Sequence, residues 1–417
     1  MSKLSGLFCF KTLSLLGSTA LPGAQRIFLY FLVEHFFGLQ FLGRFANDLS
    51  IIFMIGYFTA VGWSSMIMIR VPQTDGLAKL QTLFTIAKFS FFSLIPSCII
   101  IYFLGYLGFI FNPDLSSFVL VSWSLFMLFR RFMLALKRYH ILFAAELLVL
   151  TGIAVILWFG RKYPFAPYFS YAVPCAVVTL TAICLTTWLL KKNKLNFFNA
   201  QPGVMRHGLE FGLNNFVSGG RMLLLTPLVV QIAGEIYGGI IGLINSVLGV
   251  VQLFPRTLSQ FHLPEMSRLV KNGDSISFIG YVSKFRKQVS ALLTLIFLFS
   301  AIGWWAIGLT PYGVRLHADG AVFIFYIMLI ATVIDQAVIA DANSLMVREL
   351  SFLMLKVNFW SSIIMLLMMA GVVFLNFVPL LSVYSILSVY LVSNLLRSVW
   401  LVKLSGNYKR IEPKKAR

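Results

Sequence analysis

The sequence predicts an all-α, polytopic membrane protein with about 12 transmembrane helices in two six-helix parallel repeats. First, the 417 residues are 59% hydrophobic and only 12% charged, with a mean hydropathy of +0.88, which is not the composition of a water-soluble globule. Second, apolar runs of roughly 20 residues, enough to cross a bilayer core of about 30 Å, recur from Thr12 to Lys403. Third, the segment Gly17–Gly43 is echoed by the segment Gly212–Gly238.

Apolar runs between charged or turn-rich breaks define the expected spans. The first six are Thr12–Val33, Phe41–Met68, Gln81–Ile110, Ser116–Leu136, Ile141–Gly160 and Pro167–Leu190. The second six are Leu209–Gln231, Ile236–Phe261, Gln288–Leu309, Ala321–Met346, Ser351–Leu375 and Leu380–Val402. The resulting domains are an N-terminal lobe (1–190), a linker (191–208), a C-terminal lobe (209–403) and a basic tail (404–417). The loop Pro264–Lys287, with a turn at Asn272–Asp274, is expected to carry an amphipathic helix on the membrane surface, among anionic headgroups.

The distribution of Lys and Arg predicts that both termini and the linker are cytoplasmic. With that orientation, the opposite side holds only four basic loop residues: Arg44, Arg161, Lys162 and Arg315. The net charge of +20 therefore reflects membrane topology, because the basic residues sit in short loops and form no aromatic-interleaved face for nucleic acid.

The repeat places one arginine inside each of two apolar helices. One offset of 195 positions (212 minus 17, 221 minus 26, 238 minus 43) carries Gly17 onto Gly212, Arg26 onto Arg221 and Gly43 onto Gly238. Each arginine lies fifteen residues beyond a basic residue, Lys11 or Arg206, which at about 1.5 Å per residue is past the bilayer centre. A charge there is costly, so its occurrence in both copies suggests a shared cationic cavity.

Arg26 and Arg221 are therefore the main substrate-binding candidates, with Asn214, Asn215 and Gln25 beside them. A guanidinium suits phosphate oxygens because it can donate two parallel hydrogen bonds. The alternative is that each arginine forms a structural pair with a carbonyl or an acid.

Three acids are candidates for ion coupling: Asp335, Asp341 and Asp48. Asp335 lies well inside a span, where desolvation favours protonation near neutral pH. Asp335 and Asp341 are six residues apart and so lie on different helix faces. Asp48 follows Arg44 by four residues, which favours a local ion pair near the outer surface.

The sequence contains no motif for an enzyme, a metal or another cofactor. It lacks a Walker lysine loop, a zinc-binding helix motif and a nucleophile elbow. The cysteines, Cys9, Cys98, Cys175 and Cys184, show no paired spacing and are expected to be free thiols. We expect no enzymatic activity.

Two pairs of segments resemble one known family. Phe37–Ala46, followed by an apolar span and Arg70-Val71-Pro72, is similar to the opening of the polysaccharide flippases in the multidrug/oligosaccharidyl-lipid/polysaccharide (MOP) exporter superfamily. Ala233–Gly238 and Pro264–Leu269 resemble the opening of that family's second half.

This resemblance implies a V-shaped transporter: a pair of six-helix bundles whose cavity opens alternately to either side of the membrane. Its O-antigen members are expected to move undecaprenyl-pyrophosphate-linked oligosaccharide across the bacterial inner membrane, with a proton or sodium ion as a possible counter-ion. Anionic lipids and other polysaccharide-assembly membrane proteins are the expected partners. Two alternatives remain open: a small-molecule or drug antiporter of the same superfamily, and a membrane glycan polymerase.

Overall fold

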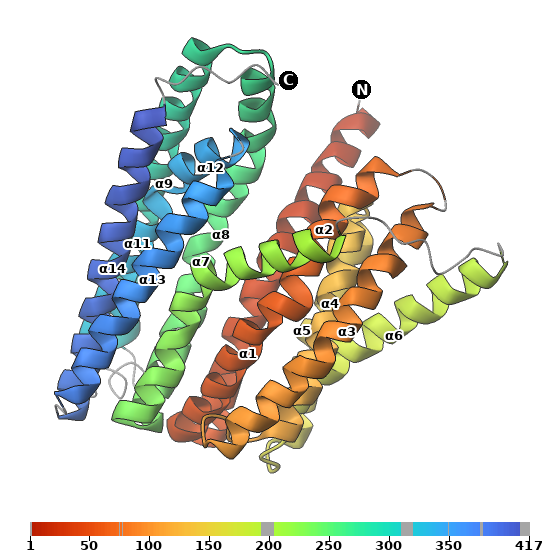
Figure 1. Cartoon of the computed structure of the whole chain (residues 1–417). Coiled ribbons are helices and arrows are strands. Elements are labelled where there is room, and N and C mark those ends of the chain that lie inside the picture. The colour runs from red at the N-terminus through yellow and green to blue at the C-terminus, as the bar shows by residue number, and fades with distance from the viewer. Residues whose placement is uncertain are drawn as a thin grey trace. The chain divides into compact units, whose positions relative to one another are not determined.

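The structure is a computed structural model that describes residues 2–74, 76, 78–192, 204–309, 320–348, 350–375 and 378–408. All regular elements within these ranges are helices (Figure 1). The all-helical fold class predicted from composition is confirmed.

The first half contains six α-helices and two short helical segments of other types. They are α1 (Ser2–Gly56), the π-helix η1 (Tyr57–Val61), α2 (Gly62–Arg70), the 3₁₀ turn η2 (Val71–Gln73), α3 (Ala78–Tyr106), α4 (Pro113–Ala135), α5 (Tyr139–Gly160) and α6 (Ala166–Lys192). The second half consists of α7 (Val204–Ala233), α8 (Glu235–Lys271), α9 (Ser275–Gly308), α11 (Ala321–Ala337), α12 (Ile339–Val347), α13 (Ser351–Phe374) and α14 (Pro379–Tyr408).

Two glycines divide the first and second spans of each half at equivalent places. Gly38 inside α1 has φ 82° and ψ 170°, and Gly234 between α7 and α8 has φ 96° and ψ 172°. Both conformations lie in a region that only glycine adopts readily, so each turn requires this residue. The two segments that carry the family resemblance, Phe37–Ala46 and Ala233–Gly238, contain these turns.

The predicted number of spans agrees with the helices. Eleven helical stretches in the described residues are long and apolar enough to cross a membrane, and the first of them, Ala20–Met68, continues through the turn at Gly38. Because its two arms are separate spans, the described chain contains twelve.

The region Pro264–Lys287 differs from the expected surface helix. Here α8 runs on to Lys271 and α9 begins at Ser275, so two long helices extend past the apolar spans and meet at the predicted turn. Gly273 takes φ 71°, and Asp274 caps α9 by accepting the Ser277 backbone N–H at 3.0 Å. These hydrogen bonds from Ser277 hold the pKa of Asp274 below its usual range. A lone amphipathic segment is absent because the helix propensity of the flanking spans carries through the polar residues.

The chain forms two compact units, Met1–Gln231 and Ile232–Arg417. The lobe boundaries predicted above stay a prediction. Residues 193–203 of the linker and 409–417 of the tail lie outside the described residues.

Most of α7 belongs to the first unit, where three of its glycines pack against η1 and α2. A Cβ on Gly208 would lie 2.3 Å from the Trp63 ring, one on Gly212 would lie 2.9 Å from the Tyr57 carbonyl oxygen, and one on Gly219 would lie 2.3 Å from the Tyr57 hydroxyl. We call this contact the glycine seam. Such small residues let two membrane helices approach until their backbones touch.

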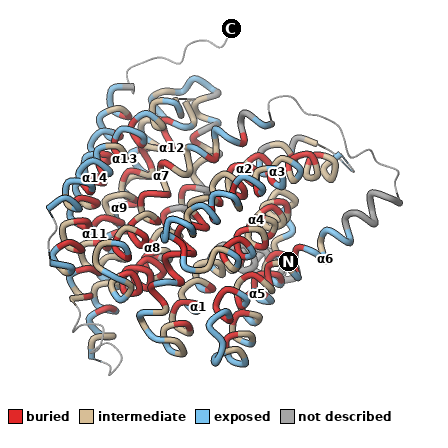
Figure 2. The backbone as a smooth tube through the Cα atoms, turned by 60° about the horizontal axis from the view of Figure 1, so that its bottom comes forward, coloured by how far each residue is buried: buried red, intermediate tan, exposed pale blue. Residues whose placement is uncertain are grey.

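Exposed stretches run along many helices (pale blue in Figure 2), and many of their residues are large and apolar. In α9 only 11% of the most apolar 18-residue window is buried, and Phe299 and Trp305 there are more than half exposed. Contiguous apolar exposure of this extent is expected only where lipid covers the surface.

Candidate functional site

Arg26 lies in the first arm of α1 and is half-buried. Its guanidinium carbon sits 5.0 Å from the centre of the Phe53 ring and 5.6 Å from that of Tyr30, within cation–π range. Among the described residues, its buried Nε has no hydrogen-bond partner. The position therefore combines a permanent positive charge, aromatic support and unused donor capacity.

Gln25 is buried, and its amide is already engaged. The Gln25 Nε2 donates to the Glu146 carboxylate Oε2 at 2.8 Å and to the Glu146 backbone carbonyl at 2.8 Å. The structure therefore gives this predicted substrate-binding residue a partner inside the protein, on α5.

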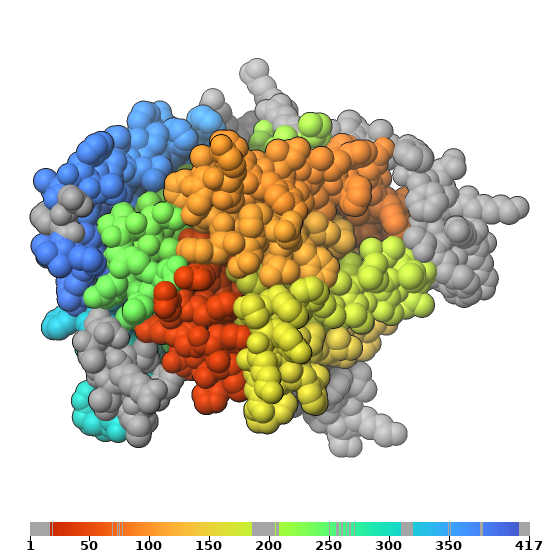
Figure 3. Space-filling model, turned by 90° about the horizontal axis from the view of Figure 1, so that it is seen from below, coloured from red at the N-terminus to blue at the C-terminus, as the bar shows by residue number. Residues whose placement is uncertain are grey.

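Glu146 is fully buried and forms an ion pair with Arg130 of α4. The Arg130 Nε lies 2.8 Å from Glu146 Oε1, and Arg130 Nη2 donates to the backbone carbonyl of Ser18 at 3.1 Å. We call Gln25, Arg130 and Glu146 the α1 clamp. In the space-filling view α1 (red) and α5 (yellow) lie side by side (Figure 3), as this clamp requires.

The other substrate-binding candidates lie on α7. Arg221 is buried, with 4% of its surface exposed. Asn215 donates to the Phe211 carbonyl of its own helix at 2.7 Å, whereas the buried Oδ1 of Asn214 has no hydrogen-bond partner among the described residues. Arg221 belongs to the same compact unit as Arg26.

Asp48 lies on α1 and is fully buried against the turn between α3 and α4. Its carboxylate accepts the Tyr168 hydroxyl at 2.7 Å and the backbone N–H groups of Phe111 and Asn112 at 3.0 and 3.1 Å. These contacts tie α1, the turn and α6 together, which is the role of a structural carboxylate. The local ion pair with Arg44 stays a prediction.

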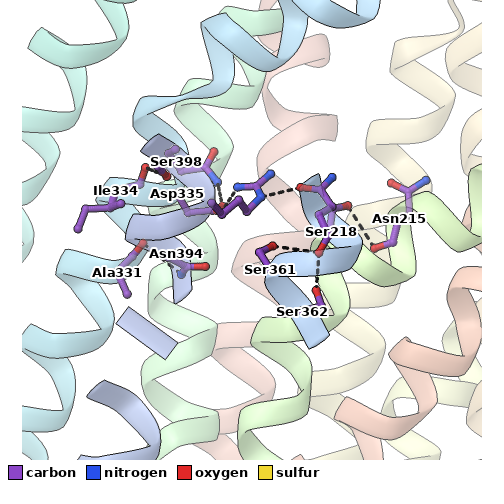
Figure 4. A network of polar contacts seen from close by, with 12 residues as sticks. Asn215, Ser218, Ala331, Ile334, Asp335, Ser361, Ser362, Asn394 and Ser398 are labelled. Atoms are coloured by element: carbon purple, nitrogen blue, oxygen red, sulfur yellow. Dashed lines mark hydrogen bonds and ion pairs between the residues drawn. The ribbon is translucent and has the colours of Figure 1, made fainter. Parts of the chain in front are cut away.

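Asp335 lies at the centre of a polar network in the second unit, which joins α11, α13 and α14 (Figure 4). The Arg397 Nη1 contacts Asp335 Oδ1 at 2.5 Å, and the Arg397 Nε donates to Asn358 Oδ1 at 2.7 Å. Gln336 donates to the other Asp335 oxygen at 3.0 Å. Arg397 is 8% exposed and Asp335 is half-buried, so α11 and α14 share a largely buried ion pair.

Asp341 is separated from that network and pairs with Arg286 of α9 at 2.5 Å. Its second oxygen, Oδ2, is buried without a hydrogen-bond partner in the described chain. Asp335 and Asp341 thus have different basic partners. They lie on separate helices, α11 and α12, because the helix predicted to hold both acids ends at Ala337 and resumes at Ile339.

Four of these residues were not predicted from the sequence as site residues: Arg130, Glu146, Asn358 and Arg397. The distance in sequence explains this: Gln25 and Glu146 are 121 residues apart, and Asp335 and Arg397 are 62 apart. The available signal was the presence of charged residues within apolar spans, which need an internal partner. Within the described residues no group of three His, Cys, Asp or Glu side chains could hold a metal ion.

Comparisons with solved structures show the fold. The chain superposes on the eukaryotic MATE transporter AtDTX14 with a TM-score of 0.66 and 13% identity, over 95% of this chain and 96% of that one. It superposes on the MATE multidrug transporter DinF-BH, solved in complex with R6G, with a TM-score of 0.63 and 11% identity, over 95% and 94% of the two chains. A MOP superfamily transporter from Pyrococcus furiosus gives a TM-score of 0.55 and 10% identity, over 97% and 95%.

No protein-family model matches the sequence, and no curated protein sequence matches it. The fold is that of the MATE transporters of the MOP superfamily.

Proposed function

We propose that this protein is a flippase that moves undecaprenyl-pyrophosphate-linked oligosaccharide, an O-antigen or similar surface polysaccharide unit, across the bacterial inner membrane. The superfamily fold supports a transporter, and the charge of the interior supports an anionic substrate. The lipid tail can remain in the bilayer during this reaction, while the pyrophosphate and sugars need a polar, positive path.

The observation that carries the proposal is the environment of Arg26. Both buried acids described in the spans of the first unit, Asp48 and Glu146, have hydrogen-bond donors of their own. The Arg26 guanidinium instead contacts aromatic rings and retains an unused Nε. A guanidinium held in this way can bind a pyrophosphate oxygen through charge-assisted hydrogen bonds.

The rival function is antiport of organic cations. DinF-BH, a multidrug transporter of this fold, was solved in complex with R6G. The Pyrococcus furiosus transporter is described as having a binding pocket of reverse polarity that suggests a different function, so this fold accommodates pockets of different polarity. A cation carrier requires an available acid, and the unneutralised group at Arg26 has the opposite charge.

A reconstituted flipping assay tests the proposal. Proteoliposomes containing the purified chain should translocate fluorescent undecaprenyl-pyrophosphate-linked oligosaccharide, and Arg26→Ala should reduce the rate strongly. Arg26→Lys should restore only part of it, because the point charge survives but the bidentate geometry does not. Arg44→Ala is the matched control, since Arg44 lies on the same helix over the Phe111 ring at 5.5 Å but is exposed. Normal flipping by well-folded Arg26→Ala, or uptake of R6G with no flipping, would refute the proposal.

A further inference from the structure

The α1 clamp holds α1 on both sides of a weak point in the helix. Arg130 binds the carbonyl of Ser18, and Glu146 binds the amide of Gln25. Pro22 and Gly23 lie between these two contacts. Proline within a helix removes a backbone hydrogen bond and favours a kink, and glycine adds backbone freedom, so the direction of the following turn is not set by the helix itself. Contacts to α4 and α5 set it instead.

The clamp also occupies both oxygens of the Glu146 carboxylate. Oε1 accepts the Arg130 Nε at 2.8 Å, and Oε2 accepts the Gln25 Nε2 at 2.8 Å. Gln25 is the residue directly before Arg26. The Glu146 oxygen that faces α1 therefore binds the neutral amide of Gln25. Glu146 does not neutralise Arg26, the next residue on α1.

We propose that Gln25 and Glu146 are positioning residues for the anion site: they fix the direction of Arg26 and keep its guanidinium free for the pyrophosphate group. This inference rests on the flippase function proposed above. Glu146 acts through α1 and does not contact the substrate. Without the Gln25 amide, Oε2 loses its partner, and a nearby cation becomes its best replacement because an unpaired buried oxygen is unfavourable.

Binding measurements in nanodiscs test this coupling, with undecaprenyl pyrophosphate as the probe. Gln25→Ala is the informative variant, since it leaves the Arg130–Glu146 ion pair in place and so should fold. Loss of the buried hydrogen bonds that Gln25 donates to Glu146 is expected to weaken binding about two- to tenfold. The same substitution in an Arg26→Ala chain should cause no further loss, since the group that it positions is gone.

Two variants separate positioning from general stability. Asn47→Ala removes another buried amide from α1, one that donates to Asp48 at 3.1 Å and to the Phe109 carbonyl at 2.7 Å, and it should leave binding unchanged. The exchange Gln25→Glu with Glu146→Gln retains one amide and one carboxylate across α1 and α5, but it places the carboxylate directly before Arg26, so it should not recover the affinity lost in Gln25→Ala. The inference would be overturned if Gln25→Ala lowered the affinity for undecaprenyl pyrophosphate equally with and without Arg26, or if Asn47→Ala lowered it as much.

A thiol-labelling experiment measures the direction of position 26 without any substrate. In a chain whose four cysteines are replaced by alanine, Arg26→Cys is labelled with an anionic methanethiosulfonate reagent. Adding Gln25→Ala or Glu146→Gln should change the labelling rate about two- to tenfold, as expected when the contacts between Gln25 and Glu146 are weakened. An unchanged rate in both variants would overturn the positioning role. If the rate changes while Arg26→Ala still binds the lipid normally, the positioning stands and the flippase function fails.

Discussion

At the scale of single residues, Asp335 shows how the structure changes a prediction made from sequence. The sequence places an acid deep in a span and suggests that it titrates during transport. The structure places Arg397 and Gln336 at its two carboxylate oxygens. Asp335 can act in transport only if this ion pair opens, so the pair itself is the element to test.

Replacing Asp335 with Asn should weaken transport that is driven by an imposed proton gradient. The amide keeps the shape of the side chain but cannot carry the charge that pairs with Arg397, and it leaves that buried arginine without an anionic partner. The measurement is the flipping rate in proteoliposomes with and without a pH step. Asp341→Asn is the comparison, because Asp341 pairs with a different residue, Arg286. Undiminished gradient dependence in Asp335→Asn removes Asp335 from the coupling mechanism.

Residue type and depth could be predicted at this scale, whereas partners could not. Arginines inside apolar helices stand out in a sequence because the bilayer makes them costly. Which acid or amide meets each one depends on packing between helices that are far apart in the chain, as Gln25 and Glu146 are. Single-sequence patterns contain no information on that packing.

At the scale of elements, the glycine seam brings α7 close to η1 and α2. The backbone there is a π-helix at Tyr57–Val61, and its Thr59 carbonyl accepts the Ser90 hydroxyl from α3. π-helical turns occur often at functional positions. Phe58 and Phe216 flank the seam with ring centroids 5.2 Å apart.

Gly62→Ala should destabilise the protein, because the added Cβ would lie 2.4 Å from the Gly208 carbonyl oxygen, a backbone atom that cannot easily move aside. Overpacking of this kind costs about 1 to 3 kcal/mol. Gly220→Ala on α7 is the matched control, since its nearest neighbour is 3.7 Å away and alanine favours the helix. Thermal unfolding in detergent measures both. A Gly62→Ala chain as stable as the parent would show that the seam is looser than described.

The elements were largely predictable, and their exceptions have local causes. Hydropathy located the twelve spans, but it did not show that Gly38 and Gly234 would form matching turns within nearly continuous helices. Hydropathy also assigned the polar ends of α8 and α9 to a loop outside the spans, although both helices continue through these residues. The packing of α7 with the first unit requires side-chain fit that hydropathy does not report.

At the scale of the whole molecule, an even number of spans predicts that both ends of the chain lie on the same side of the membrane. The bias of Lys and Arg predicts that this side is the cytoplasm. Reporter fusions after Lys192 and after Arg417 should therefore both report a cytoplasmic location. A periplasmic signal from the Arg417 fusion would contradict the topology and the parallel relation of the halves.

The central claim is that Arg26 binds the anionic head of a lipid carrier, and equilibrium binding to a series of head groups tests it most directly. Undecaprenol, undecaprenyl phosphate and undecaprenyl pyrophosphate share one lipid tail and carry no, one and two phosphate groups, so the negative charge of the head rises along the series. Affinity should rise along the series in the parent chain and in Arg44→Ala. In Arg26→Ala the affinity for the pyrophosphate should fall about tenfold to a hundredfold, which corresponds to the loss of a charge-assisted hydrogen bond, while undecaprenol binding stays the same. Equal affinities for the three lipids in the parent chain, or an unchanged series in Arg26→Ala, would contradict the claim.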